Sequence, residues 1–286
     1  MSSKHGDFSR GSVSSNIIRL ALPMIAAEFV HVLYNIVDRM YLGRIPSGGT
    51  LALSGIGISF PLVTLIGAFA QLCGTGGAPL FSITRGSGDQ EKARRIMTTA
   101  FTMLLVLGIT LTVLLFAAAP WLLRLLGGDD ETIPVALQYF RVYVLGSIPV
   151  LITLGMNPFI NAQGYPALGT TTVVIGAALN IALDPLFIFV LRMDVAGAAL
   201  ATVIAQCCSA LWVLFILTGK KLPVRLARPA IDRACAKEIV KLGVTGFTFK
   251  VTNSVTQAVV NIMLKSWGGL QSTLFITAAS LINSVR

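Results

Sequence analysis

Asp184 places a carboxylate in the middle of an apolar run, residues 169–191. Asn180 precedes it by one helical turn, and no basic residue within helical reach could neutralise it. Because an ionised carboxylate is costly at membrane depth, it usually serves a proton, a metal ion or a cationic substrate. The sequence therefore predicts that Asp184 belongs to a cation-binding site.

Polar side chains on other apolar runs could complete such a site. In the first run, Glu28, His31, Asn35 and Asp38 fall within an arc of about 80° if each residue advances by ~100°. Pairs one helical turn apart follow in three later runs: Asn157 with Asn161, Asn180 with Asp184, and Thr202 with Gln206. Carboxylate, amide and hydroxyl oxygens suit a hard monovalent cation, and a carboxylate among amides can equally take up a proton. The spacing of Cys and His residues suggests no transition-metal site.

Each polar residue except Asp184 also has a simpler explanation. Asp38 stands beside Arg39 near the end of its run and could be a solvated charge at the membrane interface. His31 could be a packing residue with a satisfied ring. The amides and hydroxyls of the later runs could serve as hydrogen bonds between helices. These alternatives stay open at the level of sequence.

The composition indicates the elements that would hold these residues. The chain is 55% hydrophobic and 12% charged, and its mean hydropathy is +0.80. These values are typical of an all-α, polytopic membrane protein and exclude a soluble chain of this length. Seven runs are long enough to cross a bilayer, and an eighth begins near Leu270. The seven are residues 17–42, 51–81, 96–126, 133–160, 169–191, 196–217 and 239–264. Prolines inside these runs, including Pro61 and Pro149, predict kinks whose freed carbonyls neighbouring helices must satisfy.

The net charge of +10 reflects loops on one side of the membrane. About fourteen basic residues fall on one side and about four on the other, which predicts a cytoplasmic N-terminal segment, 1–15, and a cytoplasmic linker, 219–237. The basic linker could instead be a patch for anionic lipid. The sequence shows no basic domain for nucleic acid, and we expect no cleavable signal peptide. The cysteines, Cys73, Cys207, Cys208 and Cys235, are interpreted as reduced packing residues.

A weak internal repeat appears when the seventh run is laid on the first. A shift of 222 residues pairs IIRLALP, from Ile17, with IVKLGVT, from Ile239, and places Glu28 opposite Lys250. Six spans separate the copies, so both cross in the same direction, as in a two-lobed transporter. The predicted organisation is a six-helix lobe, 16–218, followed by an incomplete second lobe, 238–286. Glu28 and Lys250 could form an ion pair across the pseudo-two-fold axis, or each could face a water-filled cavity alone.

Several stretches together resemble the multidrug and toxic compound extrusion (MATE) transporters, and more closely their bacterial DinF-type branch. They are LYNIVDRMYLGRIP in the first run, LALSGIGISFP in the second, GMNPFINAQGYP in the fourth, ALNIALDPLFIF in the fifth and GAALATVIAQ in the sixth. The resemblance covers nearly the whole chain. It implies two six-helix lobes around a central cavity, of which this chain would hold the first lobe and the first one to two helices of the second.

The resemblance also implies a function and a site. It implies export of amphipathic, cationic compounds in exchange for Na⁺ or H⁺ across the bacterial inner membrane, by alternating access and without another cofactor. Asp38, Asn180 and Asp184 would belong to the cation site, with Thr202 and Asn157 beside it, and Pro23 would be a hinge. Glu28, His31, Asn35, Gln206 and Lys250 would tune the site or line the cavity.

Other functions remain as alternatives. A flippase of lipid-linked saccharides should carry several cationic residues in its cavity, and only Lys250 and Arg141 qualify. A non-transporting half-molecule is a second alternative. An enzyme is not expected, because the runs hold no recognisable catalytic pair or metal triad.

Overall fold

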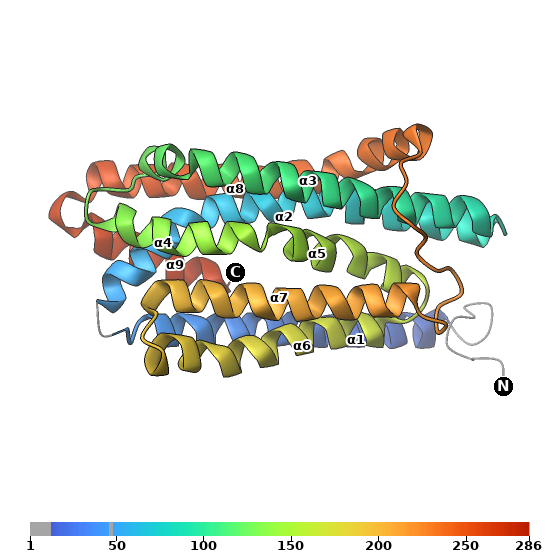
Figure 1. Ribbon diagram of the computed structural model, residues 1–286, viewed down its shortest axis with the longest axis horizontal. Coiled ribbons are helices and arrows are strands. Elements are labelled where there is room, and N and C mark those ends of the chain that lie inside the picture. Colours follow the sequence, from blue (N-terminus) through green and yellow to red (C-terminus); the bar gives the residue numbers. More distant parts are fainter. Residues whose placement is uncertain (1–12, 46–47, 286) are drawn as a thin grey trace.

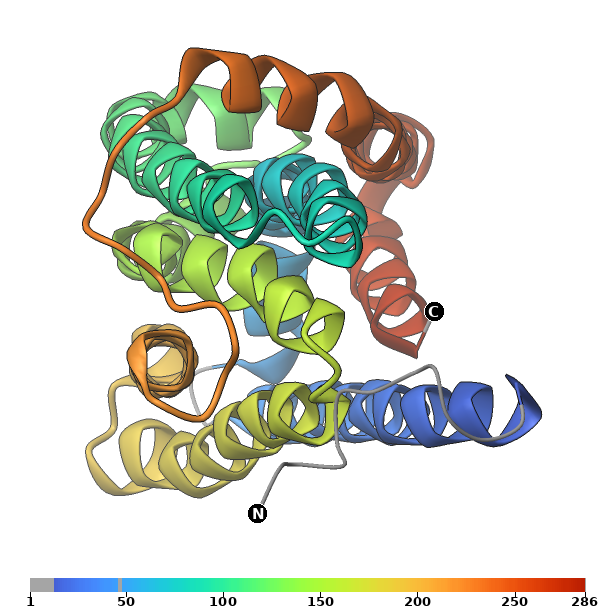
Figure 2. The same ribbon diagram turned by 90° about the vertical axis from the view of Figure 1, so that its right-hand side faces the viewer.

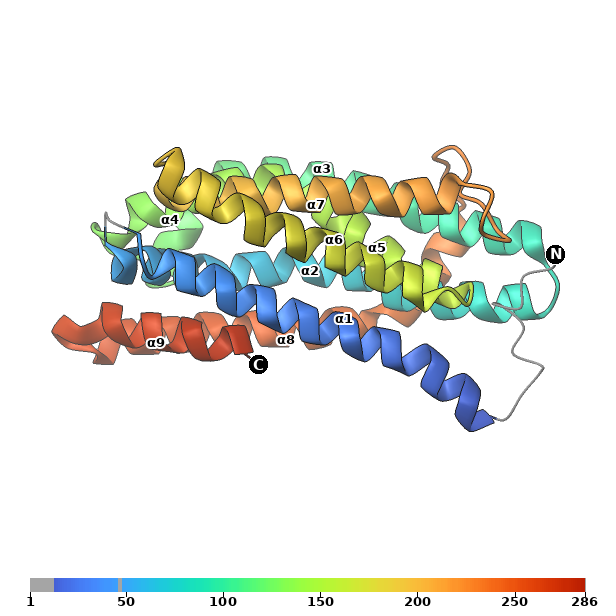
Figure 3. The same cartoon turned by 90° about the horizontal axis from the view of Figure 1, so that it is seen from below.

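The computed structural model describes residues 13–45 and 48–285, and within them it contains helices and no β-strand. The helices lie side by side along the long axis of the molecule (Figure 1 and Figure 3). Their bounds are α1 (Val13–Leu42), α2 (Gly49–Gly86), α3 (Gln90–Leu125), α4 (Thr132–Leu145), α5 (Ser147–Ala162), α6 (Pro166–Pro185), α7 (Asp194–Thr218), α8 (Arg233–Trp267) and α9 (Ser272–Val285). A π-helical turn, Leu186–Val190, extends α6, and a 3₁₀ turn, Gly269–Gln271, precedes α9. The expected all-α fold is confirmed, whereas most of the expected N-terminal segment, 1–15, lies outside the described residues.

Within the described residues, the length and apolarity of the helices support five spans, or six if one bent pair counts as a span. Five qualify alone, namely α1, α2, α3, α7 and α6 with its π-helical turn, and α4 with α5 forms a sixth, bent by 57°. The expected seventh span folds as α8, but this helix is not apolar enough to qualify by the same measure. Its crossing of a membrane therefore stays a prediction, as does the division into two lobes.

The helix α2 occupies the centre of the bundle (Figure 2). It contacts α3, α4, α5, α8 and α9, whereas α1 packs chiefly against α6 at one side. Glycines allow the closest approach between α2 and α8, since a Cβ atom added at Gly76 would lie 2.1 Å from the carbonyl oxygen of Ile239. A Cβ atom at Gly243 would likewise lie 1.9 Å from the carbonyl oxygen of Leu72. The two backbones can touch here only because both positions lack a side chain.

Two prolines act as the sequence predicts. The fourth run breaks at Gly146, where α4 ends and α5 begins, because Pro149 has no N–H to donate back to Leu145. In α2, Pro61 leaves the carbonyl of Gly57 without its helical donor. Asn261 of α8, which is 3% exposed, donates its side-chain amide to this carbonyl at 3.0 Å. A neighbouring helix thus satisfies the carbonyl that the proline frees.

The segment between α7 and α8 lies along the end of the bundle as an extended strap (orange in Figure 2). Its backbone N–H groups donate to side chains of the bundle: Val224 to Gln163, Ala227 to Thr98, Ala230 to Thr102 and Asp232 to Thr99. Asp232 also caps α8, which begins at Arg233, so residues 233–237 of the expected linker are helical. Three hydroxyl groups therefore attach the strap to α3, and the Gln163 amide attaches it to the end of α5.

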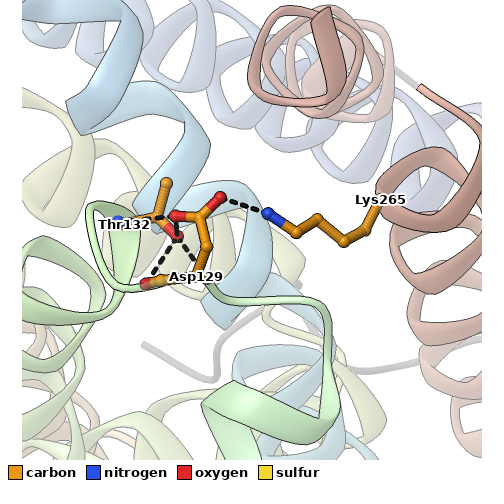
Figure 4. A network of polar contacts seen from close by, with 3 residues as sticks. All are labelled: Asp129, Thr132 and Lys265. Atoms are coloured by element: carbon orange, nitrogen blue, oxygen red, sulfur yellow. Dashed lines mark hydrogen bonds and ion pairs between the residues drawn. The ribbon is translucent and has the colours of Figure 1, made fainter. Parts of the chain in front are cut away.

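At the opposite end of the long axis, an ion pair joins the end of α8 to the α3–α4 loop (Figure 4). Lys265 donates to the carboxylate of Asp129, which also accepts from the backbone and the hydroxyl of Thr132 at 2.9 and 2.7 Å. Partial burial by itself would raise the pKa of Asp129. The hydrogen bonds from Lys265 and Thr132 outweigh it and lower the pKa to about 2.

Candidate cation site

Three of the predicted site residues meet at one place in the bundle. Asn180 and Asp184 lie one turn apart on α6, and Thr202 lies on the adjacent α7. The amide nitrogen of Asn180 is 3.3 Å from Asp184 Oδ1 and 3.3 Å from Thr202 Oγ1. Asp184 is 0% exposed and Asn180 is 3% exposed, so the packed helices bury both side chains. The i, i+4 spacing on α6 thus brings the amide and the carboxylate together, and the packing of α7 on α6 adds the hydroxyl.

Asp38 brings a second carboxyl group to this cluster from α1. It lies close enough to Asp184 for the two groups to interact directly and to share a hydrogen bond when one of them carries a proton. The neighbouring Arg39 does not bridge the two acids. Its guanidinium donates to Ser280 of α9 at 2.7 Å and lies 5.8 Å from the ring centre of Phe60 on α2.

The cluster retains unused oxygen atoms. Asp184 Oδ2 and Asn180 Oδ1 are both buried and have no hydrogen-bond partner among the described residues. Buried polar atoms are nearly always paired, so an unpaired carboxylate oxygen and an unpaired amide oxygen in one cluster point to a missing ligand. A cation, a proton or water can satisfy these atoms. The donor set of carboxylate, amide and hydroxyl oxygens matches a hard cation such as Na⁺.

Tyrosines surround the acids, and the sequence reasoning did not include them. Tyr34, one turn before Asp38 on α1, lies within electrostatic range of both acids. Tyr139 of α4 lies within range of Asp38 and stacks on Tyr143 with ring centres 5.9 Å apart. The sequence did contain a signal for them, because Tyr139 and Tyr143 are spaced i, i+4. Tyr34 and Asp38 have the same spacing, which places each pair on one helix face. Their meeting across α1 and α4, however, depends on how these helices pack.

The structure does not bring Asn157 to the acids. Its side-chain nitrogen donates to the carbonyl of Gly169 at 3.3 Å, and its oxygen lies 3.5 Å from the hydroxyl of Thr172. Thr172 precedes Asn180 by eight residues, which is about 12 Å along α6. Asn157 therefore belongs to a separate polar cluster, and its part in cation binding stays a prediction.

Gln206 and Asn161 are also placed away from the acids. Gln206 lies one turn beyond Thr202 on α7, and its side-chain oxygen is buried without a partner. Asn161 lies near the end of α5, where its side-chain oxygen is likewise unpaired. A Cβ atom at Gly169 would lie 2.2 Å from that oxygen, so a larger residue there would displace the Asn161 side chain.

The remaining predicted residues lie along α1 and α8. Glu28 and His31 are exposed, and Asn35 donates to the carbonyl of His31 at 2.8 Å within the same helix. Glu28 and Lys250 are both described, and no ion pair joins them. Lys250 is half-buried and lies within electrostatic range of His31. Their part in lining a cavity or tuning the cation site stays a prediction.

Pro23 lies inside α1, where its carbonyl accepts a hydrogen bond from the hydroxyl of Thr170 on α6 at 2.7 Å. This contact and the pair of Asp38 with Asp184 both join α1 to α6. The hydrogen bond from Thr170 thus helps to hold α1 against the helix on which it chiefly packs.

Known proteins of similar sequence are multidrug exporters. The chain is 27% identical over 265 residues to the multidrug export protein MepA of Staphylococcus haemolyticus, a match that covers 91% of the chain and 58% of that protein. MepA of Staphylococcus aureus strain N315 is 24% identical over the same share of both chains. The chain thus spans less than two thirds of the length of these relatives.

Solved structures share the fold. The MATE multidrug transporter DinF-BH, in complex with R6G, has a TM-score of 0.91 and 28% identity, covering 99% of this chain and 63% of that one. A MOP superfamily transporter from Pyrococcus furiosus, whose binding pocket is described as having reverse polarity, has a TM-score of 0.86 and 26% identity, covering 100% and 63%. Residues 23–186 match the MatE family, and they hold Asp38, Asn180 and Asp184. Because this match extends over more than half of the chain, the chain belongs to the MatE family of transporters.

Proposed function

We propose that this chain forms the cation-binding part of an antiporter that exports amphipathic, cationic compounds in exchange for Na⁺ or H⁺. The multidrug export described for its relatives supports the export of small molecules. The excess of basic residues on one side supports a cytoplasmic N-terminus in a bacterial inner membrane. The coupling ion is proposed to bind at Asp38, Asn180, Asp184 and Thr202.

One observation carries this proposal. Asp184 is completely buried, keeps one carboxylate oxygen without a partner and lies beside a second carboxyl group. Two adjacent carboxylates repel each other when both are ionised, and a bound cation or proton removes that repulsion. The occupied and the empty site therefore differ strongly in energy.

The positions of the acids suggest how occupancy could drive movement. Asp38 lies on α1 and Asp184 on α6, and α1 packs chiefly against α6. A cation held by both acids would draw these helices together, and an empty site would push them apart. The ion thereby favours one packing of α1, which would bias the movement of one lobe against the other in alternating access.

The test is ion-driven efflux of a cationic dye from vesicles that contain the protein. We expect Asp184→Asn and Asp38→Asn to abolish the dependence of efflux on the Na⁺ or H⁺ gradient, because each removes one of the two charges that the ion neutralises. Asp130→Asn is the matched control, since Asp130 is exposed in the α3–α4 loop. Unchanged ion-driven efflux in Asp184→Asn would refute the proposal.

A further inference from the structure

A groove of about 540 Å³ lies away from the cation site, between the end of α2, the start of α3 and the first turns of α8. Four charged side chains line it: Asp89, Lys92, Glu238 and Lys241. Its apolar part includes Ile83 and Leu242, which are 71% and 47% exposed. The groove therefore combines charges of both signs with exposed apolar surface, and the cation site uses none of these residues.

The four charged groups are not paired with one another. All four lie in the described part of the chain, and no ion pair joins any two of them. One oxygen of Asp89 caps α3 by accepting the backbone N–H of Lys92 at 2.9 Å. Two ammonium groups and two carboxylates thus face one groove, and together they carry no net charge. Such a lining suits a ligand that itself carries both signs.

The groove lies at the level where the hydrocarbon of a membrane gives way to headgroups. The helix α2 has 38 residues, or about 57 Å at 1.5 Å per residue, against ~30 Å of hydrocarbon. Its apolar sequence ends near Phe81, and the charged sequence of α3 begins at Glu91. The last turns of α2 therefore extend into the headgroup region, with Ile83 directed outward.

We propose that this groove binds the headgroup of a zwitterionic phospholipid with a primary ammonium, of the phosphatidylethanolamine type. Lys92 and Lys241 bind the phosphate, and Asp89 and Glu238 accept hydrogen bonds from the ammonium. Ile83 and Leu242 contact the start of an acyl chain. An anionic headgroup without an ammonium leaves two carboxylates facing a negative ligand, and a choline headgroup offers no N–H donor.

The experiment titrates the purified, delipidated protein with phosphatidylethanolamine, phosphatidylglycerol and phosphatidylcholine of equal chain length and measures bound lipid by native mass spectrometry. We expect phosphatidylethanolamine to bind most tightly. Lys241→Gln and Glu238→Gln should each weaken its binding by about fivefold, as one interfacial charge contributes on the order of 1 kcal/mol. Lys237→Gln is the matched control, because Lys237 is exposed on α8 and lies outside the groove.

Three outcomes would overturn the proposal. Equal binding of the three lipids would show that the groove does not select a headgroup. Equal loss of binding in Lys237→Gln and Lys241→Gln would show a general attraction to charge. If phosphatidylglycerol binds more tightly than phosphatidylethanolamine, and if Glu238→Gln strengthens that binding further, the groove is a surface for anionic lipid instead. Because Glu238 and Lys241 are exposed, the variants are expected to fold, and equal melting temperatures without lipid check this. The result does not depend on ion-coupled export.

Discussion

The fold shields Asp129 from solvent in part and Asp184 completely, and the surroundings of these two acids satisfy them differently. Asp129 accepts hydrogen bonds from Lys265 and Thr132, so a fixed cation of the chain neutralises it. Asp184 accepts one hydrogen bond from Asn180, and its other oxygen has no partner in the described part of the chain. The first acid fastens α8 to the α3–α4 loop and is structural. We propose that the second acid binds the coupling ion.

The largest difference between these acids is expected in the response to cations. Asp184→Asn should abolish the rise in stability that the coupling ion gives, which reaches about 2.7 kcal/mol when the free ion is 100 times its Kd. Asp129→Asn should lower stability but retain the full rise. The measurement is thermal unfolding in detergent, with Na⁺ varied at constant pH and pH varied at constant Na⁺.

Without the ion, the two substitutions should also change the free energy of unfolding in different directions. Removing the charge of Asp184 relieves repulsion with Asp38, so Asp184→Asn should be at least as stable as the unaltered protein without the ion. Asp129→Asn should be less stable, because it leaves Lys265 without its partner. A cation response that survives in Asp184→Asn and disappears in Asp129→Asn would reverse the assignment of the two acids.

Asn261, like Asp129, is a buried or partly buried polar residue whose hydrogen bond joins α8 to another part of the bundle. Asn261→Leu keeps the approximate shape but leaves the buried carbonyl of Gly57 without a donor, which should cost about 2 kcal/mol of unfolding free energy. Pro61→Ala restores the backbone N–H that can donate to the same carbonyl. The loss from Asn261→Leu should therefore shrink in the Pro61→Ala background.

This double-mutant cycle distinguishes satisfaction of the carbonyl from simple packing. Its coupling energy, measured by unfolding of the four proteins in mixed micelles, should be on the order of 1 kcal/mol. If Asn261→Leu costs the same with Pro61 and with alanine at that position, the amide contributes only through its packing against α2.

The candidate site was predictable where it depends on spacing along one helix. Asn180 and Asp184 follow the i, i+4 rule on α6, and the structure places Thr202 beside them. The rule fixes the face of a helix but not the height at which helices meet. Asn157 has a suitable face, yet it contacts Gly169 and Thr172, about two turns before Asn180.

The fold was predictable to a similar degree. Long apolar runs predicted the helices, and prolines predicted interruptions, of which Pro149 with Gly146 produces the 57° bend. The close contact of α2 with α8 was harder to predict from the sequence. It depends on Gly76 and Gly243, which meet although 167 positions separate them along the chain. Contacts between distant glycines carry no periodic signal, and packing alone decides which of the glycines meet.

The smallest predicted effect is the pH dependence of the Asp129 pair. The pKa of Asp129 is about 2 in the folded protein, below its ordinary value of 3.8. The stabilisation from a lowered pKa is therefore complete above about pH 4 and is lost as the pH falls through 2. The unaltered protein should exceed Asp129→Asn in unfolding free energy by about 1 kcal/mol at pH 6 and by almost nothing near pH 2, since the pair is partly solvated.

Unfolding of both proteins between pH 2 and pH 6 checks this, with Asp130→Asn as the exposed neighbour that should show no such trend. A difference that stays constant over this range would mean that Asp129 contributes through its neutral hydrogen bonds to Thr132 rather than through Lys265. In that case neither acid would be neutralised by the chain. The contrast with Asp184 would then rest on burial alone, because Asp129 remains partly accessible and Asp184 does not.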